Sequence, residues 1–191
     1  MSELLSNPLV LKRLRDELKR VVGMERMVRE SDLPRLLYLQ AVAKETLRFH
    51  PPAPLPVPHL SVEACKLLGY EIPRNTRVYV NVWAIGRNPK AWEDAQRFMP
   101  ERFMQRGFLD EKIHNLEWIP FGAGRRRCPG QQLGTSVVEL ALAQLVHCFD
   151  WTLPGGLNGQ ELDMSESNSG LTVHRAQELR AVPTPRLPMV L

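Results

Sequence analysis

One short stretch gathers several groups that could do chemistry: FGAGRRRCPG, residues 121–130. It places Cys128 directly behind three consecutive arginines and just ahead of a predicted helix over 131–148. The partial positive charge of a helix N-terminus and nearby guanidinium groups both stabilise a thiolate. Pro129 suits the entry to such a helix. The sequence therefore predicts a reactive or metal-ligating sulfur at Cys128.

A stabilised thiolate can act as a nucleophile, as a redox group or as a metal ligand. A nucleophile needs a base close by, and the nearest histidines, His114 and His147, belong to no recognisable catalytic motif. A resolving cysteine is not local, and no CxxC or HxxxH indicates zinc. The pattern favours one open-sited metal cofactor, whose carboxylates the arginines could bind. Gly122, Gly124 and Gly130 would let the backbone approach something flat and bulky.

The helices and strands that must position this loop can be predicted from the spacing of apolar residues and from helix-breaking residues. Apolar spacing predicts amphipathic or buried helices over 2–22, 37–49 and 131–148, a strand over 77–82, a helical turn over 83–88 and a last strand near 179–185. Pro51 and Pro52 end the second helix. Residues 89–120 show little periodicity, which predicts a long irregular segment. A loop of this length should be functional or carefully packed. The expected fold class is mainly α with small β-sheets.

The helix over 131–148 carries an apolar stripe broad enough for a buried helix. Its members are Leu133, Val137, Leu140, Ala141, Leu145 and Cys148. Asn75 stands in a predicted turn, and asparagine tolerates the left-handed backbone conformation that such turns need.

Composition excludes several classes of protein. The chain has 191 residues, 43% of them hydrophobic, which suffices for a folded core. Its net charge of +4 is mild, the basic residues are spread along the chain, and only 7% of residues are aromatic, so we expect no nucleic-acid partner. Three widely spaced cysteines argue against a disulfide framework. We see no signal peptide and no apolar run of transmembrane length.

The spacing F-x-x-G-x-R-x-C-x-G in this stretch resembles the haem-thiolate loop of the cytochrome P450 monooxygenases. Two further stretches are similar to motifs of that family: ETLR at 45–48 resembles its E-x-x-R motif, and PERF at 100–103 resembles the segment that supplies a second arginine. SDLPRLLYLQAVAKETLRFHPP and EWIPFGAGRRRCPG look like land-plant members that hydroxylate specialised metabolites. The resemblance covers nearly the whole chain.

The resemblance implies a cofactor and the residues that hold it. Cys128 would be the axial ligand of the iron of haem b, and Arg126 would bind a propionate. Phe121 and Gly122 would lie on the thiolate side of the ring. His59 stands where relatives often carry a group near a propionate, although a surface-loop histidine explains it equally well.

The resemblance also assigns two further sets of residues. Glu45, Arg48 and Arg102 would form a buried charge network behind the haem that fixes the cysteine loop. Leu55, Val57 and Leu171 match segments that commonly line the substrate pocket, although both segments could equally be ordinary packed loops.

The match implies only part of a family member. The whole chain, 1–191, resembles the C-terminal haem-binding part as one partial domain, with no counterpart of the distal helix or of the membrane anchor. For the longer protein of which this chain would be a part, we expect O2 and a small apolar plant metabolite as substrates and NADPH–cytochrome P450 reductase as the electron donor. We expect that protein to lie at the cytosolic face of the endoplasmic reticulum. The fragment alone would bind haem poorly and lack steady turnover. A non-catalytic truncated remnant and a basic nucleic-acid-binding module remain as alternatives.

Overall fold

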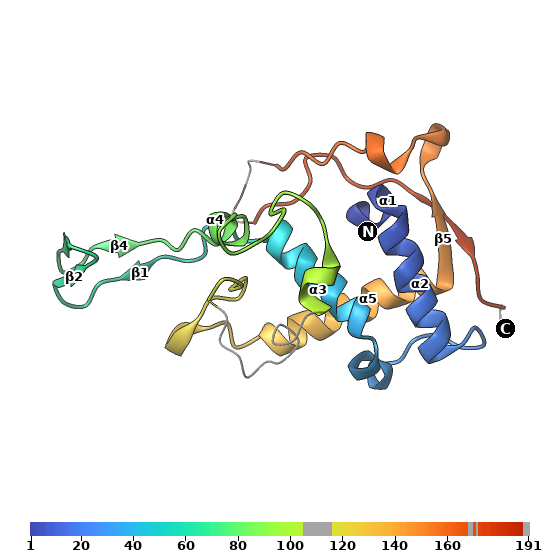
Figure 1. Cartoon of the computed structure of the whole chain (residues 1–191), viewed down its shortest axis with the longest axis horizontal. Helices are drawn as coiled ribbons and strands as arrows, with labels where there is room; N and C mark the ends of the chain where they lie inside the picture. The colour runs from blue at the N-terminus through green and yellow to red at the C-terminus, as the bar shows by residue number, and fades with distance from the viewer. Residues whose placement is uncertain (105–115, 168–169, 171, 189–191) are drawn as a thin grey trace.

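The computed structural model describes residues 1–104, 116–167, 170 and 172–188. Its longer helices are α2 (Pro8–Val22), α3 (Leu37–Phe49) and α5 (Gln131–Cys148). The shorter α-helices are α1 (Ser2–Ser6) and α4 (Val82–Gly86), and the 3-10 turns are η1 (Glu30–Arg35), η2 (Pro100–Met104), η3 (Gly124–Arg126), η4 (Pro154–Gly156) and η5 (Gly159–Glu161). The strands are β1 (His59–Leu60), β2 (Cys65–Leu67), β3 (Tyr70–Ile72), β4 (Arg77–Val78), β5 (Phe149–Thr152) and β6 (Val182–Pro185). The fold is mainly α with small antiparallel sheets, as predicted (Figure 1).

The predicted helix over 2–22 is two helices, and this correction has a local cause. Asn7 separates α1 from α2 and leaves the helical region, with φ −123° and ψ 76°. The ring of Pro8 disfavours the α conformation of the residue before it, whereas proline itself suits the first position of the following helix. The Asn7 side-chain amide donates to the main-chain oxygen of Glu3 at 2.8 Å and so closes α1.

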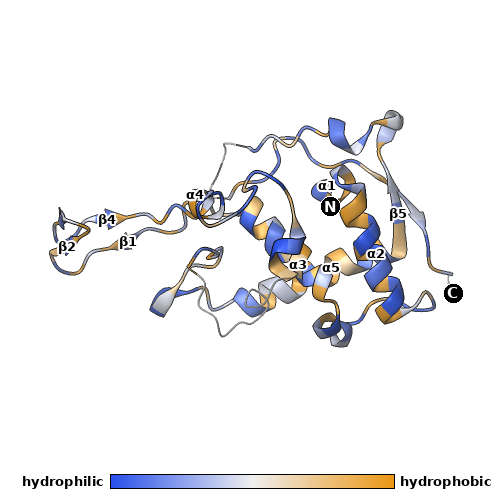
Figure 2. Ribbon diagram, viewed as in Figure 1, coloured by the Kyte–Doolittle hydropathy of each residue, from blue (hydrophilic) through white to orange (hydrophobic). Residues whose placement is uncertain are grey.

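The core lies where α2, α3 and α5 meet. Leu14, Leu18, Leu39, Val42 and Val146 are each almost fully buried there. Figure 2 shows the apolar and polar bands that alternate along α2 and α3, as expected for helices with one face against a core. These helices therefore form the main apolar core of the described residues.

The buried carboxylate of Glu17, on α2, caps the N-terminus of α3. Glu17 is 8% exposed, and its two oxygens accept the N–H groups of Tyr38 and Leu39 at 2.8 and 2.9 Å. These N–H groups belong to the first turn of α3, where no intrahelical partner exists, and a negative charge there also suits the helix dipole. The capping group thus comes from another helix, and α3 has the predicted bounds.

The apolar stripe of α5 is only partly buried, which corrects the prediction of a buried helix. The bounds of α5 are as predicted, and Ala143 and Val146 pack into the core. Leu133 and Val137 are 72% and 56% exposed, although α2, α3, η1 and β5 all contact α5. The structure therefore presents an apolar helix face to solvent.

A two-stranded ribbon extends away from the helices, on the left of Figure 1. Its strands pair β1 with β4 and β2 with β3, both antiparallel. Asn75 has φ 64°, so it takes the left-handed conformation foreseen for it. The predicted strand over 77–82 ends at Val78. Asn81 caps α4 instead, accepting the N–H of Ala84 at 2.9 Å, so the helical turn begins one residue before its predicted start.

The irregular segment over 89–120 contains η2, and its residues 105–115 lie outside the described part. Near the C-terminus β6 pairs with β5, in agreement with the predicted last strand. Among the described residues no helix combines the length and hydropathy needed to cross a membrane.

Candidate functional site

The site is built on a buried pair of opposite charges within α3. Glu45 and Arg48 are three residues apart, so they share one helix face. The guanidinium of Arg48 binds both carboxylate oxygens, with Nε at 2.6 Å from Oε2 and Nη2 at 2.8 Å from Oε1. Both side chains have no exposed surface. Desolvation of two charges is costly, so this pairing requires further hydrogen bonds to be stable.

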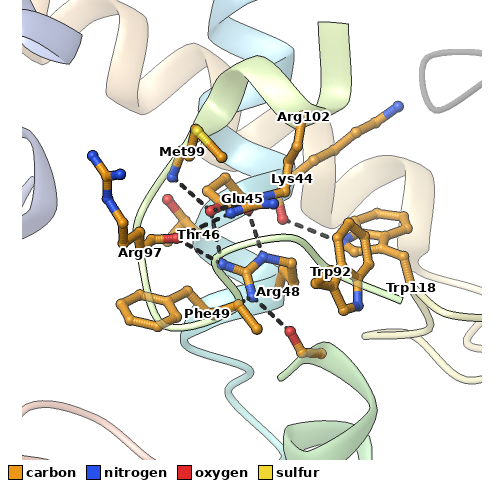
Figure 3. A network of polar contacts seen from close by, with 12 residues as sticks. Lys44, Glu45, Thr46, Arg48, Phe49, Trp92, Arg97, Met99, Arg102 and Trp118 are labelled. Carbon is orange, nitrogen blue, oxygen red and sulfur yellow. Dashed lines mark hydrogen bonds and ion pairs between the residues drawn. The ribbon is translucent and has the colours of Figure 1, made fainter. Parts of the chain in front are cut away.

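Main-chain oxygens supply those hydrogen bonds. Arg48 Nη1 donates to Gly86 at 2.6 Å and to Ala95 at 2.9 Å, and Nη2 donates to Arg97 at 3.0 Å. With the two bonds to Glu45, all five N–H groups of the guanidinium have partners. Figure 3 shows Arg48 at the centre of this arrangement, between α3, α4 and the loop that precedes η2. One side chain thus fixes three segments of chain.

Arg102 completes the cluster from η2, 57 residues beyond Glu45. Its Nε lies 3.2 Å from Glu45 Oε1, which also accepts the N–H of Met99 at 2.7 Å. Arg102 Nη1 donates to the main-chain oxygen of Glu93 at 2.8 Å. The structure therefore brings together the three charges that the sequence assigned to one network.

Trp118 connects this cluster to the cysteine loop. Its indole N–H donates to the main-chain oxygen of Lys44 at 3.1 Å, next to Glu45 (Figure 3). Its ring packs edge-on against Phe103, the neighbour of Arg102, with centroids 6.0 Å apart. The sequence prediction missed Trp118; a signal was present, since an aromatic residue three positions before Phe121 needs a partner for its N–H.

The cysteine loop itself is a compact turn. The N–H of Cys128 donates to the oxygen of Phe121 at 2.9 Å and closes the loop on itself. Gly122 and Gly124 have φ 75° and 69°, a conformation that glycine adopts without strain. Gly130 is the N-cap of α5, so Cys128 lies two residues before the N-cap and three before Gln131, at the predicted entry to the helix.

Cys128 and Arg126 are both exposed to solvent. The described part of the chain does not enclose either group. Within that part, no ion pair joins Arg125, Arg126 or Arg127 to a carboxylate. The other two cysteines lie outside this loop. Cys148 is buried, which raises the pKa of its thiol, and Cys65 is exposed in strand β2.

Of the remaining predicted site residues, those that the structure describes are exposed to solvent. Leu55 and Val57 are 51% and 74% exposed, a level that apolar core residues do not show. His59 is exposed in β1, where its backbone pairs with Val78. Leu171 lies outside the described residues.

Comparison with known proteins identifies the family to which this fold belongs. The family model for Cytochrome P450 matches residues 1–177. The chain therefore belongs to the cytochrome P450 family.

The similar proteins include several from plants. Cytochrome P450 71AP13 of Prunus mume is 52% identical over 188 residues, and Cytochrome P450 71D10 of Glycine max is 48% identical over 188 residues. Each match covers 98% of this chain but 36% of the relative. A zebrafish cytochrome P450 solved with abiraterone superposes with a TM-score of 0.80 at 31% identity, covering 97% of this chain and 42% of that chain. The chain thus spans about a third of the length of the curated relatives it matches.

The cofactor of this family is haem, and the cysteine loop fits one of its faces. An exposed thiol at a helix entry can ligate iron, and the free guanidinium of Arg126 can bind a carboxylate. The space beside both glycines of the loop is open, since a Cβ added to Gly122 or Gly124 would have no atom within 4 Å. The donor set therefore fits the thiolate side of a planar, carboxylate-bearing metal cofactor.

Proposed function

We propose that this chain forms the thiolate-side part of a haem-dependent monooxygenase. The observation that carries the proposal is the exposed sulfur of Cys128, on a loop that Trp118 joins to the buried Glu45–Arg48–Arg102 cluster. A loop attached to a buried charge cluster holds its cysteine in a fixed position for metal ligation. Cys128 would ligate the iron of haem b, Arg126 would bind a propionate, and Phe121 and Gly122 would lie against the ring. When bound, haem supplies the oxygen chemistry, and a thiolate ligand favours it.

The reaction of the whole protein would insert one atom of O2 into a small apolar plant metabolite. Electrons would come from NADPH–cytochrome P450 reductase, at the cytosolic face of the endoplasmic reticulum. Support for the reaction class comes from a relative named flavonoid 3',5'-hydroxylase, from Crocosmia x crocosmiiflora, which is 44% identical over 190 residues. Leu55, Val57 and Leu171 would face the substrate, and His59 would approach a propionate.

The 191 residues by themselves would bind haem weakly and turn over poorly. The apolar side chains of Leu55, Val57, Leu133 and Val137 support this part of the proposal, because the described part of the chain leaves each of them in contact with water. The same observation favours a second candidate function, a non-catalytic remnant that does not take up haem.

A haem titration of the chain distinguishes the two candidates. We expect the reduced, carbon monoxide-treated protein to give the thiolate-type absorption band. Cys128→Ser should abolish that band, whereas Cys65→Ser and Cys148→Ser should leave it unchanged. A band that survives Cys128→Ser would overturn the ligand assignment, and no haem uptake at all would favour the remnant.

A further inference from the structure

A histidine outside the cysteine loop lies between two carboxylates from distant segments. His50, at the end of α3, has Nε2 2.7 Å from Glu3 Oε1 and Nδ1 3.3 Å from Glu166 Oε1. The side chains of Glu3, His50 and Glu166 are 13%, 27% and 34% exposed. All three border a cavity of about 180 Å³, which also has apolar walls such as Val42 and Val173. The contacts are therefore partly shielded from water.

The segment that Glu166 belongs to has little other support. It leaves η5 and crosses above α1 toward α4 in Figure 1, and none of its described residues from 160 to 176 is buried. Polar contacts hold it instead: Arg175 Nη1 contacts Ser2 Oγ at 3.1 Å, and the N–H of Val173 donates to the oxygen of Pro52 at 2.8 Å. Without a buried apolar face, the placement of residues 163–167 and 172–175 depends on such contacts.

The two contacts of His50 depend on protonation. A neutral imidazole carries one N–H, so it can donate to only one carboxylate, whereas the imidazolium carries two. The imidazolium also makes charge-assisted hydrogen bonds, which are stronger than neutral ones. The full bridge from Glu3 through His50 to Glu166 therefore requires the charged ring and is reduced to one contact when the ring is neutral.

Other charges face this bridge from every neighbouring element. The terminal ammonium of Met1 lies near Glu3 and Arg175, and Arg87, which follows α4, acts on Glu166. His174 lines the same cavity from the held segment and makes no side-chain contact with a described carboxylate.

We propose that His50 is a positioning residue that fixes the described residues 163–167 and 172–175 against α1 and the end of α3, and that it does so fully only with a charged ring. The segment contains Gly170 and Thr172, on either side of Leu171, so its relevance to substrate rests on the proposed function. The positioning itself does not, because its evidence is confined to α1, α3 and the segment.

Amide hydrogen exchange of the haem-free chain, read by peptide, tests the proposal. Peptides that cover 163–176 should exchange about tenfold faster in His50→Gln and in Glu166→Gln than in the unaltered chain at about pH 5 to 6, because a charge-assisted hydrogen bond is lost. Peptides from α2, α3 and α5 should keep their protection. His174→Gln is the matched control: it removes a histidine from the same cavity and should leave 163–176 unchanged.

The pH profile separates positioning from a general structural role. After correction for the intrinsic pH dependence of exchange, protection of 163–176 in the unaltered chain should fall as the pH rises, because the neutral ring keeps only one of the two contacts. In His50→Gln it should stay flat. Equal protection in all variants, a loss spread over the helices, or a pH dependence that survives His50→Gln would each overturn the proposal. The measurement uses no haem, so failure of the haem titration leaves this result standing, and the reverse also holds.

Discussion

Trp118 and Lys44 lie 74 residues apart in the chain, and the indole N–H of the first donates to the main-chain oxygen of the second at 3.1 Å. This hydrogen bond joins the segment that leads into the cysteine loop to α3, the helix that carries Glu45 and Arg48. The ring of Trp118 also contacts Phe103, so the contact is both polar and apolar. The position of the loop is thereby coupled to the buried charge cluster.

Replacing Trp118 should separate loop placement from overall stability. Trp118→Phe keeps an aromatic ring but loses the N–H, and should lower the free energy of unfolding by about 1 kcal/mol. It should also reduce haem uptake, because the loop loses its tie to Lys44. Trp151→Phe is the matched control, since its N–H likewise donates to a main-chain oxygen, that of Leu145, at 2.8 Å. A similar stability cost without any change in haem uptake is expected there, and equal effects on uptake would contradict the coupling.

The buried charge cluster should be far more sensitive than any surface pair. Glu45→Ala leaves Arg48 and Arg102 as uncompensated buried charges, so we expect a loss of roughly 3–5 kcal/mol in the free energy of unfolding, measured by denaturant titration. Asp16→Ala removes the partner of Lys12, a pair with side chains 63% and 73% exposed, and should cost less than about 1 kcal/mol. A cost for Glu45→Ala as small as that for Asp16→Ala would mean that the cluster contributes no more than a surface pair.

The sequence predicted those parts of this cluster that local spacing determines. The bounds of α3 and α5 follow from apolar periodicity and from the breakers at their ends, and the pairing of Glu45 with Arg48 follows from their separation of three. The contact with Arg102 spans 57 residues and carries no local pattern. Only the resemblance to a family pointed to it.

Other features could not be predicted because their partners are distant or are main-chain atoms. His50 and Glu166 are 116 residues apart, and Trp118 binds a main-chain oxygen, which has no side-chain identity to read. The exposed face of α5 misled the prediction for another reason. Apolar residues indicate that a face prefers burial, but not whether the chain at hand supplies what covers it.

Acid should remove a stabilising contribution from Asp32. Its hydrogen bond with Arg26, helped by the N–H of Arg29 and by Arg35, holds the pKa of this carboxyl well below its usual range. A depressed pKa in the folded state stabilises the fold above the unfolded value of about 3.9, and this contribution is lost as the pH falls toward the folded value.

Comparison of Asp32→Asn with the unaltered chain measures that contribution. The difference in the free energy of unfolding should be largest at neutral pH and should shrink steadily below about pH 4. Asp16→Asn, in an exposed pair, should show a small difference that hardly changes with pH. A difference for Asp32→Asn that stays constant from neutral to acid pH would show that its charge does not stabilise the fold.

Gly86 and Gly134 should respond in opposite ways to the same substitution. Both lie within helices, where alanine is favoured over glycine by roughly 0.5–1 kcal/mol. A Cβ on Gly134 would lie 3.9 Å from Phe121 Cε1, an ordinary contact, so Gly134→Ala should raise the free energy of unfolding by about that amount. A Cβ on Gly86 would lie 2.7 Å from the main-chain oxygen of Arg48, which is too close for any carbon.

Gly86→Ala must therefore push α4 away from α3, and the oxygen of Gly86 would leave the Nη1 group of Arg48. Because a buried guanidinium then loses an acceptor, we expect the free energy of unfolding to fall by about 1–3 kcal/mol despite the better helix propensity. Denaturant titration of the two variants side by side gives the sign of each effect. If Gly86→Ala stabilises the chain as Gly134→Ala does, α4 does not depend on its close approach to Arg48, and the cluster tolerates the loss of that oxygen.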